Sequence, residues 1–185
     1  MAPELLTSVV IDRTMATARV LVVDDEPVFL RAVSKMLSKH GYDVLQANDP
    51  RQALEAINGQ GPIDVVLSDG QMPEMPGTDL IREFARISPQ TACILMTGGT
   101  VDSAEIPGCL HVLRKPIPRL DLIAAVIEAV AHSTSLRNQL RASVEISAAL
   151  REEAQSLRRE CVRVIRQSVE QVSRLKRELD KEPGA

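Results

Sequence analysis

The sequence predicts an α/β fold in which helices cover both faces of a parallel sheet. Between residues 19 and 132, short apolar runs of strand length alternate with longer segments whose apolar residues recur at helical spacing. The connections between these segments are short, which favours parallel strands joined by crossover helices. Only 2% of the residues are aromatic while 44% are hydrophobic, so the core must consist mainly of aliphatic side chains.

Five apolar runs are expected to be the strands of this sheet. The run Val-Leu-Val-Val after Arg19 has the continuous apolar character of a strand that is buried on both faces. The run Ile-Asp-Val-Val-Leu-Ser, which begins at Ile63, is of the same kind. The predicted strands cover residues 19–24, 43–47, 63–68, 91–97 and 110–113.

Helices are expected between the strands, where start and stop signals frame the helical periodicity. Asp49 followed by Pro50 is a strong helix start, because an aspartate caps a helix and proline fits the first turn. Gly41 and the Ser88-Pro89 pair are helix stops. The predicted helices cover residues 27–40, 50–58, 78–87 and 119–132.

Residues 133–182 differ in character and are expected to form a long helix without Gly or Pro. Their apolar stripe recurs about every 3.6 positions, and a helix of about 45 residues would reach about 70 Å, too far to bury that stripe on so small a domain. We therefore expect a homodimer through a coiled coil, with Ser147 and Ser168 as polar positions on the seam and a register shift near Cys161. A lone, partly frayed helix is the alternative. The stripe consists of Leu136, Leu140, Val144, Leu150, Ala154, Leu157, Cys161, Ile165, Val172, Leu175 and Leu179.

Four segments of different character divide the chain, and Met15 in the first of them is a possible translation start. The sequence leaves open whether the helix at 119–132 continues through residues 133–135, which are mediocre helix formers. The predicted segments are a weakly ordered lead (1–17), the α/β domain (18–132), the coiled-coil helix (133–182) and a tail (183–185).

Composition points to a cytoplasmic protein without a membrane partner. No apolar run approaches the roughly 20 residues that span a bilayer. The N-terminus lacks the basic start of a secretory signal. Three irregularly spaced cysteines indicate neither a disulfide framework nor a zinc site, and they fit a reducing compartment.

Five polar residues lie at or just beyond the carboxyl ends of predicted strands: Asp24, Asp25, Asp69, Thr97 and Lys115. These strand ends converge on one edge of an open α/β sheet, where ligands bind. Neighbouring carboxylates suit a partly hydrated Mg²⁺, and a carboxylate such as Asp69 can attack a phosphoryl group as a nucleophile. Lys115 can stabilise the equatorial oxygens, and Thr97 can donate a hydrogen bond to one of them. The residues therefore predict a site for Mg²⁺ and a phosphoryl group.

The chain resembles the receiver domain of two-component response regulators in four segments. They read VLVVDDEP, DVVLSDGQMPEMPG, CILMTGG and VLRKPI, and they fall in the family's order with similar spacing within about residues 18–132. The resemblance implies a five-stranded, doubly wound parallel sheet of the flavodoxin-like type. It also implies a phosphoryl donor, which is a phosphohistidine on a sensor histidine kinase or on a phosphotransfer protein.

The resemblance also assigns a role to each residue that matches the family's motifs. It makes Asp69 the phospho-acceptor, Thr97 the switch hydroxyl and Lys115 the phosphate-binding lysine. It implies that Asp24, Asp25 and Asp69 bind Mg²⁺ together with the backbone carbonyl of Gln71. The chain is then no enzyme, apart from the phosphorylation and dephosphorylation of its own aspartate.

Two departures from the family's pattern concern signalling. Val112 stands three positions before the lysine, where the family often has an aromatic switch residue. The neighbouring His111 is a candidate substitute, although a surface histidine is the more ordinary role. The lysine lies only 18 positions after Thr97, and the segment between them includes Pro107-Gly108, so the fourth helix should be short or irregular. Output is then expected to run through the last helix into the coiled coil.

Other readings fit the sequence less well. Gln71 stands where a phosphatase of the haloacid type has a second acid, and His132 lacks the flanking residues of a kinase phospho-acceptor box. Gly59-Gln60-Gly61 lacks the third glycine of a dinucleotide loop.

Three hypotheses of function follow. The first is a response regulator that signals through its C-terminal helix by dimerisation or protein–protein interaction. The second is a constitutive coiled-coil scaffold, or a phosphate sink, that docks to a kinase. The third is DNA binding through arginines in the helix, since residues 133–185 hold 11 basic against 8 acidic residues. It is disfavoured because these arginines alternate with glutamates, a pattern typical of a solvated helix face. The arginines in question are Arg158, Arg159, Arg163 and Arg166.

Overall fold

The computed structural model describes residues 17–59, 61–101 and 103–179. The predicted lead, apart from residue 17, and the predicted tail lie outside these residues. The chain divides into two compact units, with the boundary between Arg137 and Asn138. The predicted domain limits at 132 and 133 remain predictions.

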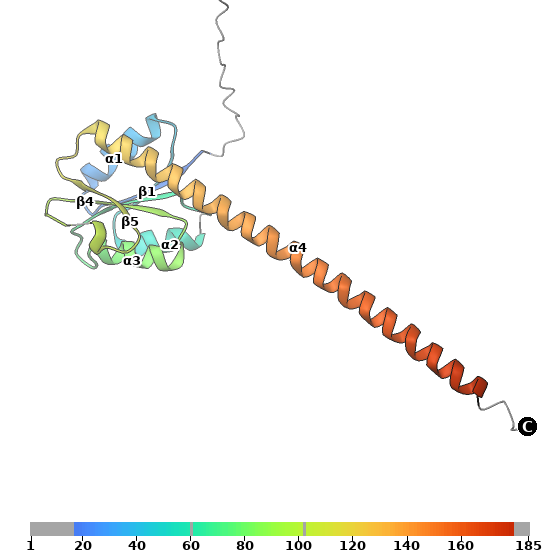
Figure 1. Ribbon diagram of the computed structural model, residues 1–185. Helices are drawn as coiled ribbons and strands as arrows, with labels where there is room; N and C mark the ends of the chain where they lie inside the picture. Colours follow the sequence, from blue (N-terminus) through green and yellow to red (C-terminus); the bar gives the residue numbers. More distant parts are fainter. Residues whose placement is uncertain (1–16, 60, 102, 180–185) are drawn as a thin grey trace, which may run out of the picture. The chain divides into compact units, whose positions relative to one another are not determined.

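The first unit is built on a five-stranded parallel sheet, as predicted (Figure 1). The strand order is β2-β1-β3-β4-β5. β1 lies between β2 and β3, so the chain adds β2 on one side of β1 and the later strands on the other side. The carboxyl ends of β1 and β3 therefore flank the switch point where doubly wound sheets bind ligands. The strands are β1 (Arg19–Val23), β2 (Asp43–Ala47), β3 (Val65–Asp69), β4 (Ala92–Thr97) and β5 (Cys109–Arg114).

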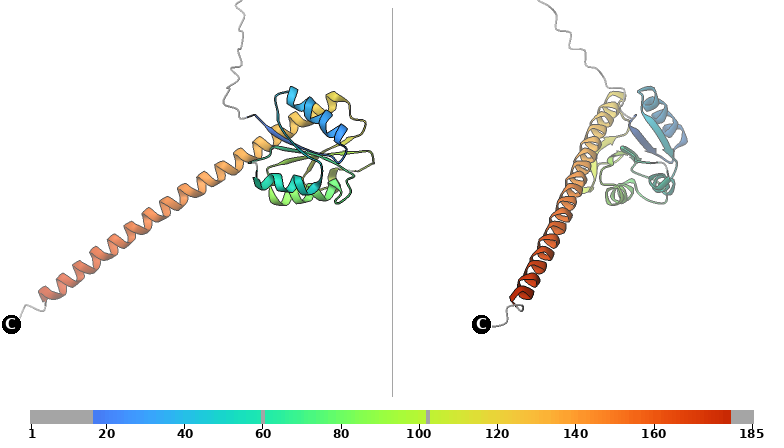
Figure 2. Two further views of the ribbon diagram at one scale, coloured as in Figure 1. Left: turned by 180° about the vertical axis from the view of Figure 1, so that it is seen from behind. Right: turned by 90° about the vertical axis from the view of Figure 1, so that its right-hand side faces the viewer.

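Helices cover both faces of this sheet (Figure 2). On one face, α1 (Pro27–Lys39) and the first turns of α4 (Arg119–Leu179) bury apolar side chains against the central strands. On the other face, α2 (Pro50–Gly59) and α3 (Gly77–Ile87) form a second cluster around the fully buried Phe84. The predicted elements are confirmed in type and order, and the bounds of the strands and of the first three helices differ from the prediction by at most two residues.

In its described residues, the connection from β4 to β5 has one short 3₁₀ helix, η1 (Ser103–Glu105), in agreement with the expectation that the fourth helix is short or irregular. Ile106 after η1 is buried in the second cluster. Gly108 has φ +85°, and a Cβ there would lie 2.4 Å from the Cβ of Ala85, so the turn into β5 requires glycine. The pairing of β5 with β4 shifts register between Cys93 and Ile94.

Helix α4 is continuous over 61 residues, from Arg119 to Leu179. It passes through residues 133–135, the point that the sequence left open. Ser133 is fully buried within the first unit, so packing there outweighs the modest helix propensity of serine. Arg137, the last residue of that unit, forms an ion pair with the buried Asp64, just before β3. None of the helices in the described residues contains an apolar stretch that could cross a membrane.

Candidate functional site

Three carboxylates meet at the carboxyl edge of the sheet, as the sequence predicted. Asp24 and Asp25 directly follow β1, and Asp69 is the last residue of β3. One oxygen from each carboxylate lies within 4.8 Å of the others. Asp24 and Asp69 are buried while Asp25 is exposed, so the cluster opens to solvent on one side. Within the described ranges, this is the one group of three or more possible metal-ligating side chains.

Lys115 connects two of these carboxylates. Its Nζ lies 2.9 Å from Asp24 Oδ2 and 3.0 Å from Asp69 Oδ1. Burial by itself lowers the pKa of Lys115, but the hydrogen bonds and charges of Asp24 and Asp69 outweigh it, and the net pKa is raised. Lys115 therefore stays cationic and supplies the site's positive charge.

The backbone places Lys115 and Thr97 together. The Lys115 N–H donates to the carbonyl of Thr97 at 2.8 Å, so the end of β5 is fixed to the end of β4. Thr97 is buried, and its Oγ1 accepts the N–H of Gly99 at 3.1 Å. Met96, the residue before Thr97, pairs in register with Asp69. The hydroxyl-bearing residue thus lies one position beyond the strand partner of the candidate acceptor.

The loop after β3 closes tightly around Asp69. The N–H of Gly77 donates to the carbonyl of Gly70 at 3.2 Å. A Cβ at Gly77 would lie 1.9 Å from the carbonyl oxygen of Asp69, so only glycine allows this approach. Gln71 is an exposed residue of this loop. The role of its carbonyl as a metal ligand remains a prediction.

Two contacts that the sequence analysis missed hold the site's charged groups. The ring of Phe29 in α1 lies 4.2 Å from Lys115 Nζ, so the ammonium rests on an aromatic face. The backbone N–H of Glu26 donates to Asp24 Oδ1 at 2.9 Å, which leaves Oδ2 for Lys115. The sequence marks Phe29 only as an apolar residue of the helix predicted at 27–40. Its position in the first turn after the acidic pair was the available signal.

Val112 and His111, which stand where the chain departs from the family's aromatic switch residue, contact different parts of the first unit. Val112 packs against the cluster under α2 and α3. His111 Nε2 lies 2.9 Å from Glu128 Oε2 of α4. His111 therefore links β5 to the last helix, which is a contact between elements rather than an isolated surface position.

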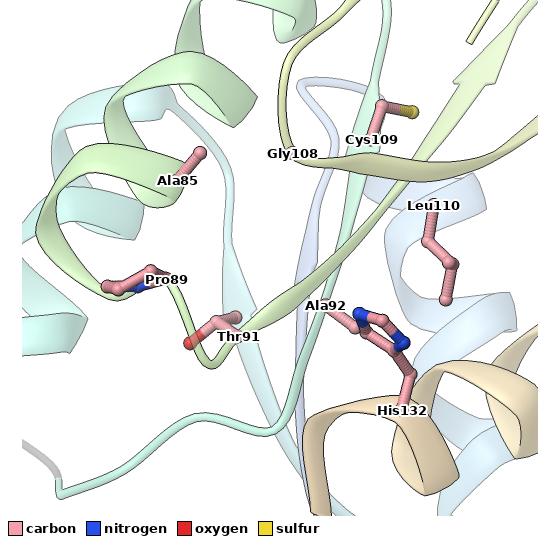
Figure 3. Close-up of a pocket in the computed structure, with 8 residues that line it drawn as sticks. All are labelled: Ala85, Pro89, Thr91, Ala92, Gly108, Cys109, Leu110 and His132. Carbon is pink, nitrogen blue, oxygen red and sulfur yellow. The ribbon is translucent and has the colours of Figure 1, made fainter. Parts of the chain in front are cut away.

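A cavity of about 300 Å³ lies at the other end of β4 (Figure 3). Figure 3 shows Ala85 and Pro89 on one side of it, and Leu110 and His132 on the other. Ala92 at the start of β4 lines this cavity, whereas Thr97 at its end belongs to the carboxylate site. The cavity is thus separate from the predicted site, and it brings no carboxylate to His132.

The site's chemistry is oxygen-rich and mixed in charge. Three carboxylates can hold a hard cation, and a lysine fixed between two of them can compensate the charge of an incoming anion. Such an arrangement is suited to phosphoryl chemistry rather than to an apolar ligand.

Comparisons with known proteins agree with this geometry. The family profile of the response regulator receiver domain matches residues 20–127. The chain is 35% identical over 121 residues to the transcriptional regulatory protein ZraR of Escherichia coli K12. The matched region covers 63% of this chain and 27% of that protein. It is 36% identical over 89 residues to the probable transcriptional regulatory protein TcrX of Mycobacterium tuberculosis, and the matched region covers 48% of this chain and 38% of that protein. The chain thus spans less than half the length of these relatives.

Solved structures are similar over the same region. A response regulator receiver domain protein from Clostridium thermocellum has a TM-score of 0.60 and 34% identity, and the match covers 64% of this chain and 98% of that one. The chemotaxis protein CheY4 of Vibrio cholerae has a TM-score of 0.56 and 30% identity, with 62% and 99% covered. With the sheet order, the carboxylate cluster and the profile match in agreement, the chain belongs to the response regulator receiver domain family.

Proposed function

We propose that this chain is a two-component response regulator that accepts a phosphoryl group on Asp69. The observation that carries the proposal is the carboxylate cluster of Asp24, Asp25 and Asp69, within 4.8 Å, with Lys115 between two of its members. Receiver domains accept phosphoryl groups from histidine kinases or phosphotransfer proteins, so the proposed donor is a phosphohistidine on such a partner.

The chemistry of the transfer assigns a task to each residue. An oxygen of the Asp69 carboxylate attacks the phosphorus while the bond from phosphorus to the histidine nitrogen breaks and leaves its electrons on the imidazole. The ammonium of Lys115 compensates the charge of the equatorial oxygens. The hydroxyl of Thr97 donates a hydrogen bond to one of these oxygens, in place of its present role as acceptor from Gly99.

The donor set fits Mg²⁺, a hard cation that prefers oxygen ligands and retains several waters. Asp24, Asp25 and Asp69 would hold the ion with the backbone carbonyl of Gln71, and the exposed side of Asp25 leaves room for water. When bound, the ion neutralises part of the repulsion between the carboxylate and the phosphoryl oxygens.

For output, we propose that the second unit dimerises or binds another protein through the exposed apolar residues of α4. Leu150 and Leu157 illustrate this surface, with 61% and 62% of their areas exposed. The proposal places the protein in the cytoplasm, without membrane or nucleic-acid partners and without catalysis beyond the chemistry of its own aspartate.

Light scattering with Mg²⁺ and beryllofluoride, a mimic of the aspartyl phosphate, tests both parts of the proposal. A mass that changes only in the activated wild type, and not in Asp69→Asn, would mean that phosphorylation controls assembly. An identical dimer in every condition would favour the constitutive scaffold or phosphate sink. Asp79→Asn is the matched control, because Asp79 is an exposed carboxylate of α3 that pairs with Arg82. Stoichiometric phosphate uptake by Asp69→Asn from a phosphohistidine donor would overturn the site assignment.

A further inference from the structure

The centre of the second unit carries a regular seven-residue pattern. Ser147, Leu150, Ala154, Leu157 and Cys161 follow one another at alternating spacings of three and four residues. All five are exposed. In a two-helix coiled coil such residues occupy the two core positions, a and d, and the residues next to the core occupy positions e and g.

The two flanks of this stripe carry opposite charges. The e positions are Arg151 and Arg158, and the g positions are Glu153 and Glu160. Side chains on one helix meet at spacings of three and four residues. At these spacings, Arg151, Glu153 and Arg158 each have only uncharged neighbours in the sequence, so none of them can form an ion pair within its own helix. Glu160, in contrast, pairs with Arg163 at 2.6 Å.

These charges discriminate between the two orientations of a homodimer. In a parallel, in-register pair, a g residue faces the e residue five positions later in the other helix. Glu153 of each copy would then face Arg158 of the other copy, twice per dimer by symmetry. In an antiparallel pair, e faces e and g faces g, so arginine would face arginine and glutamate would face glutamate.

We propose that α4 pairs with a second copy of this chain as a parallel, in-register coiled coil, with Leu150 and Leu157 at its axis. This inference rests on the proposed homodimer and adds its orientation and register. The Glu153–Arg158 contacts between the copies specify the orientation, and the apolar stripe supplies the buried area.

Cysteine crosslinking far from the centre of the helix tests the orientation. Leu140 lies on the stripe near the start of the second unit, and Leu140→Cys is combined with Cys161→Ser, oxidised with copper phenanthroline in air and run on a non-reducing gel. A parallel pair brings the two new thiols together and gives a covalent dimer. In a fully overlapping antiparallel pair they would be about 55 Å apart. Cys161→Ser alone is the control for crosslinks through Cys109.

Charge reversal tests the proposed contact itself. We expect Arg158→Glu to weaken the dimer about tenfold, because two attractive contacts become repulsive. Glu153→Arg combined with Arg158→Glu should restore the affinity. Arg151→Glu is the matched control, because it makes the same change at the other e position. In the parallel pair this position faces Ile146, so the dimer affinity should stay within about twofold of wild type. An antiparallel pair predicts instead that neither single reversal weakens association, because residue 158 would face either Arg151 or residue 158 of the other copy, so no attractive contact would be lost.

The mass of each variant separates the two levels of the inference. A wild-type chain that is monomeric by light scattering at all concentrations, with and without beryllofluoride, would overturn the proposed homodimer. A dimer that gives no covalent Leu140→Cys product would retain the homodimer and overturn the parallel orientation.

Discussion

The parts of α4 before and after the unit boundary contain similar apolar residues, but these residues differ in burial. In the first unit, Leu122, Val126 and Ala129 are buried against the sheet. In the second unit, Leu150 and Leu157 expose about three fifths of their areas, at 61% and 62%. The difference shows that burial in the first unit is supplied by the chain itself, whereas the second unit leaves its apolar stripe for another surface.

This contrast has a cost in free energy. Burial of a leucine side chain is worth roughly 1.5–3 kcal/mol, which the second unit forgoes as a single helix. Ion pairs between neighbouring turns, such as Arg141–Glu145, add only about 0.5 kcal/mol each. A long helix of this composition is therefore expected to gain most of its stability from a partner.

Core truncation provides the strongest test of the comparison. Phe84→Ala should lower the free energy of unfolding of the first unit by about 3–5 kcal/mol, because it leaves a cavity under α3. Leu150→Ala should leave that free energy within about 0.5 kcal/mol of wild type and should weaken self-association instead. The fluorescence of Tyr42, the only tyrosine in a chain without Trp, follows unfolding of the first unit in urea, since Tyr42 packs against its first core cluster.

Equal loss of first-unit stability in both variants would contradict the comparison. It would mean that Leu150 is part of the same cooperative core. Measurements at several protein concentrations separate the effect of association from that of packing.

Two arginines four positions apart in α4 sharpen the comparison. Arg137 pairs with the buried Asp64, whereas Arg141 pairs with Glu145 on an exposed surface. Arg137→Ala should cost about 1–3 kcal/mol in the same Tyr42 assay, because it removes a partner of a buried carboxylate. Asp64 would keep its bond from the Arg19 N–H, at 2.7 Å. Arg141→Ala should cost less than about 0.5 kcal/mol. A larger loss for Arg141→Ala than for Arg137→Ala would reverse the assignment of the unit boundary.

The smallest expected effect concerns a helix cap. Asp49 Oδ1 accepts the N–H of Gln52 at 2.7 Å at the start of α2, so Asp49→Ala should lower first-unit stability by about 1 kcal/mol. Ser143→Ala removes a hydroxyl bond to the Gln139 carbonyl within the second unit and should leave that stability unchanged. Identical urea midpoints for Asp49→Ala and wild type would show that the cap contributes nothing to the first unit.

Much of the first unit could be predicted from local patterns. The apolar run of β1 and the Asp49-Pro50 helix start are local signals, and local signals fix the type and order of elements. The site was predictable for a related reason. Asp24 and Asp69 lie at strand ends, and parallel topology brings such ends together however far apart they are in sequence.

Contacts that depend on three-dimensional packing could not be predicted. Arg137 belongs by its pattern to the amphipathic helix, and nothing local pairs it with Asp64. The continuity of α4 depends on the burial of Ser133, which propensity alone does not reveal. The aromatic contact between Phe29 and Lys115 likewise exists only because α1 and β5 lie close in space.

β5 forms one edge of the sheet, and an exposed edge can recruit a strand from another molecule. Its shifted register opposite Cys93 and Ile94 and the charge of Arg114 at its end both oppose such recruitment. The proposed pairing through a helix would raise the local concentration of the chain's own sheet edges. The shifted register and the terminal charge of β5 would then favour association through side chains over association through backbone.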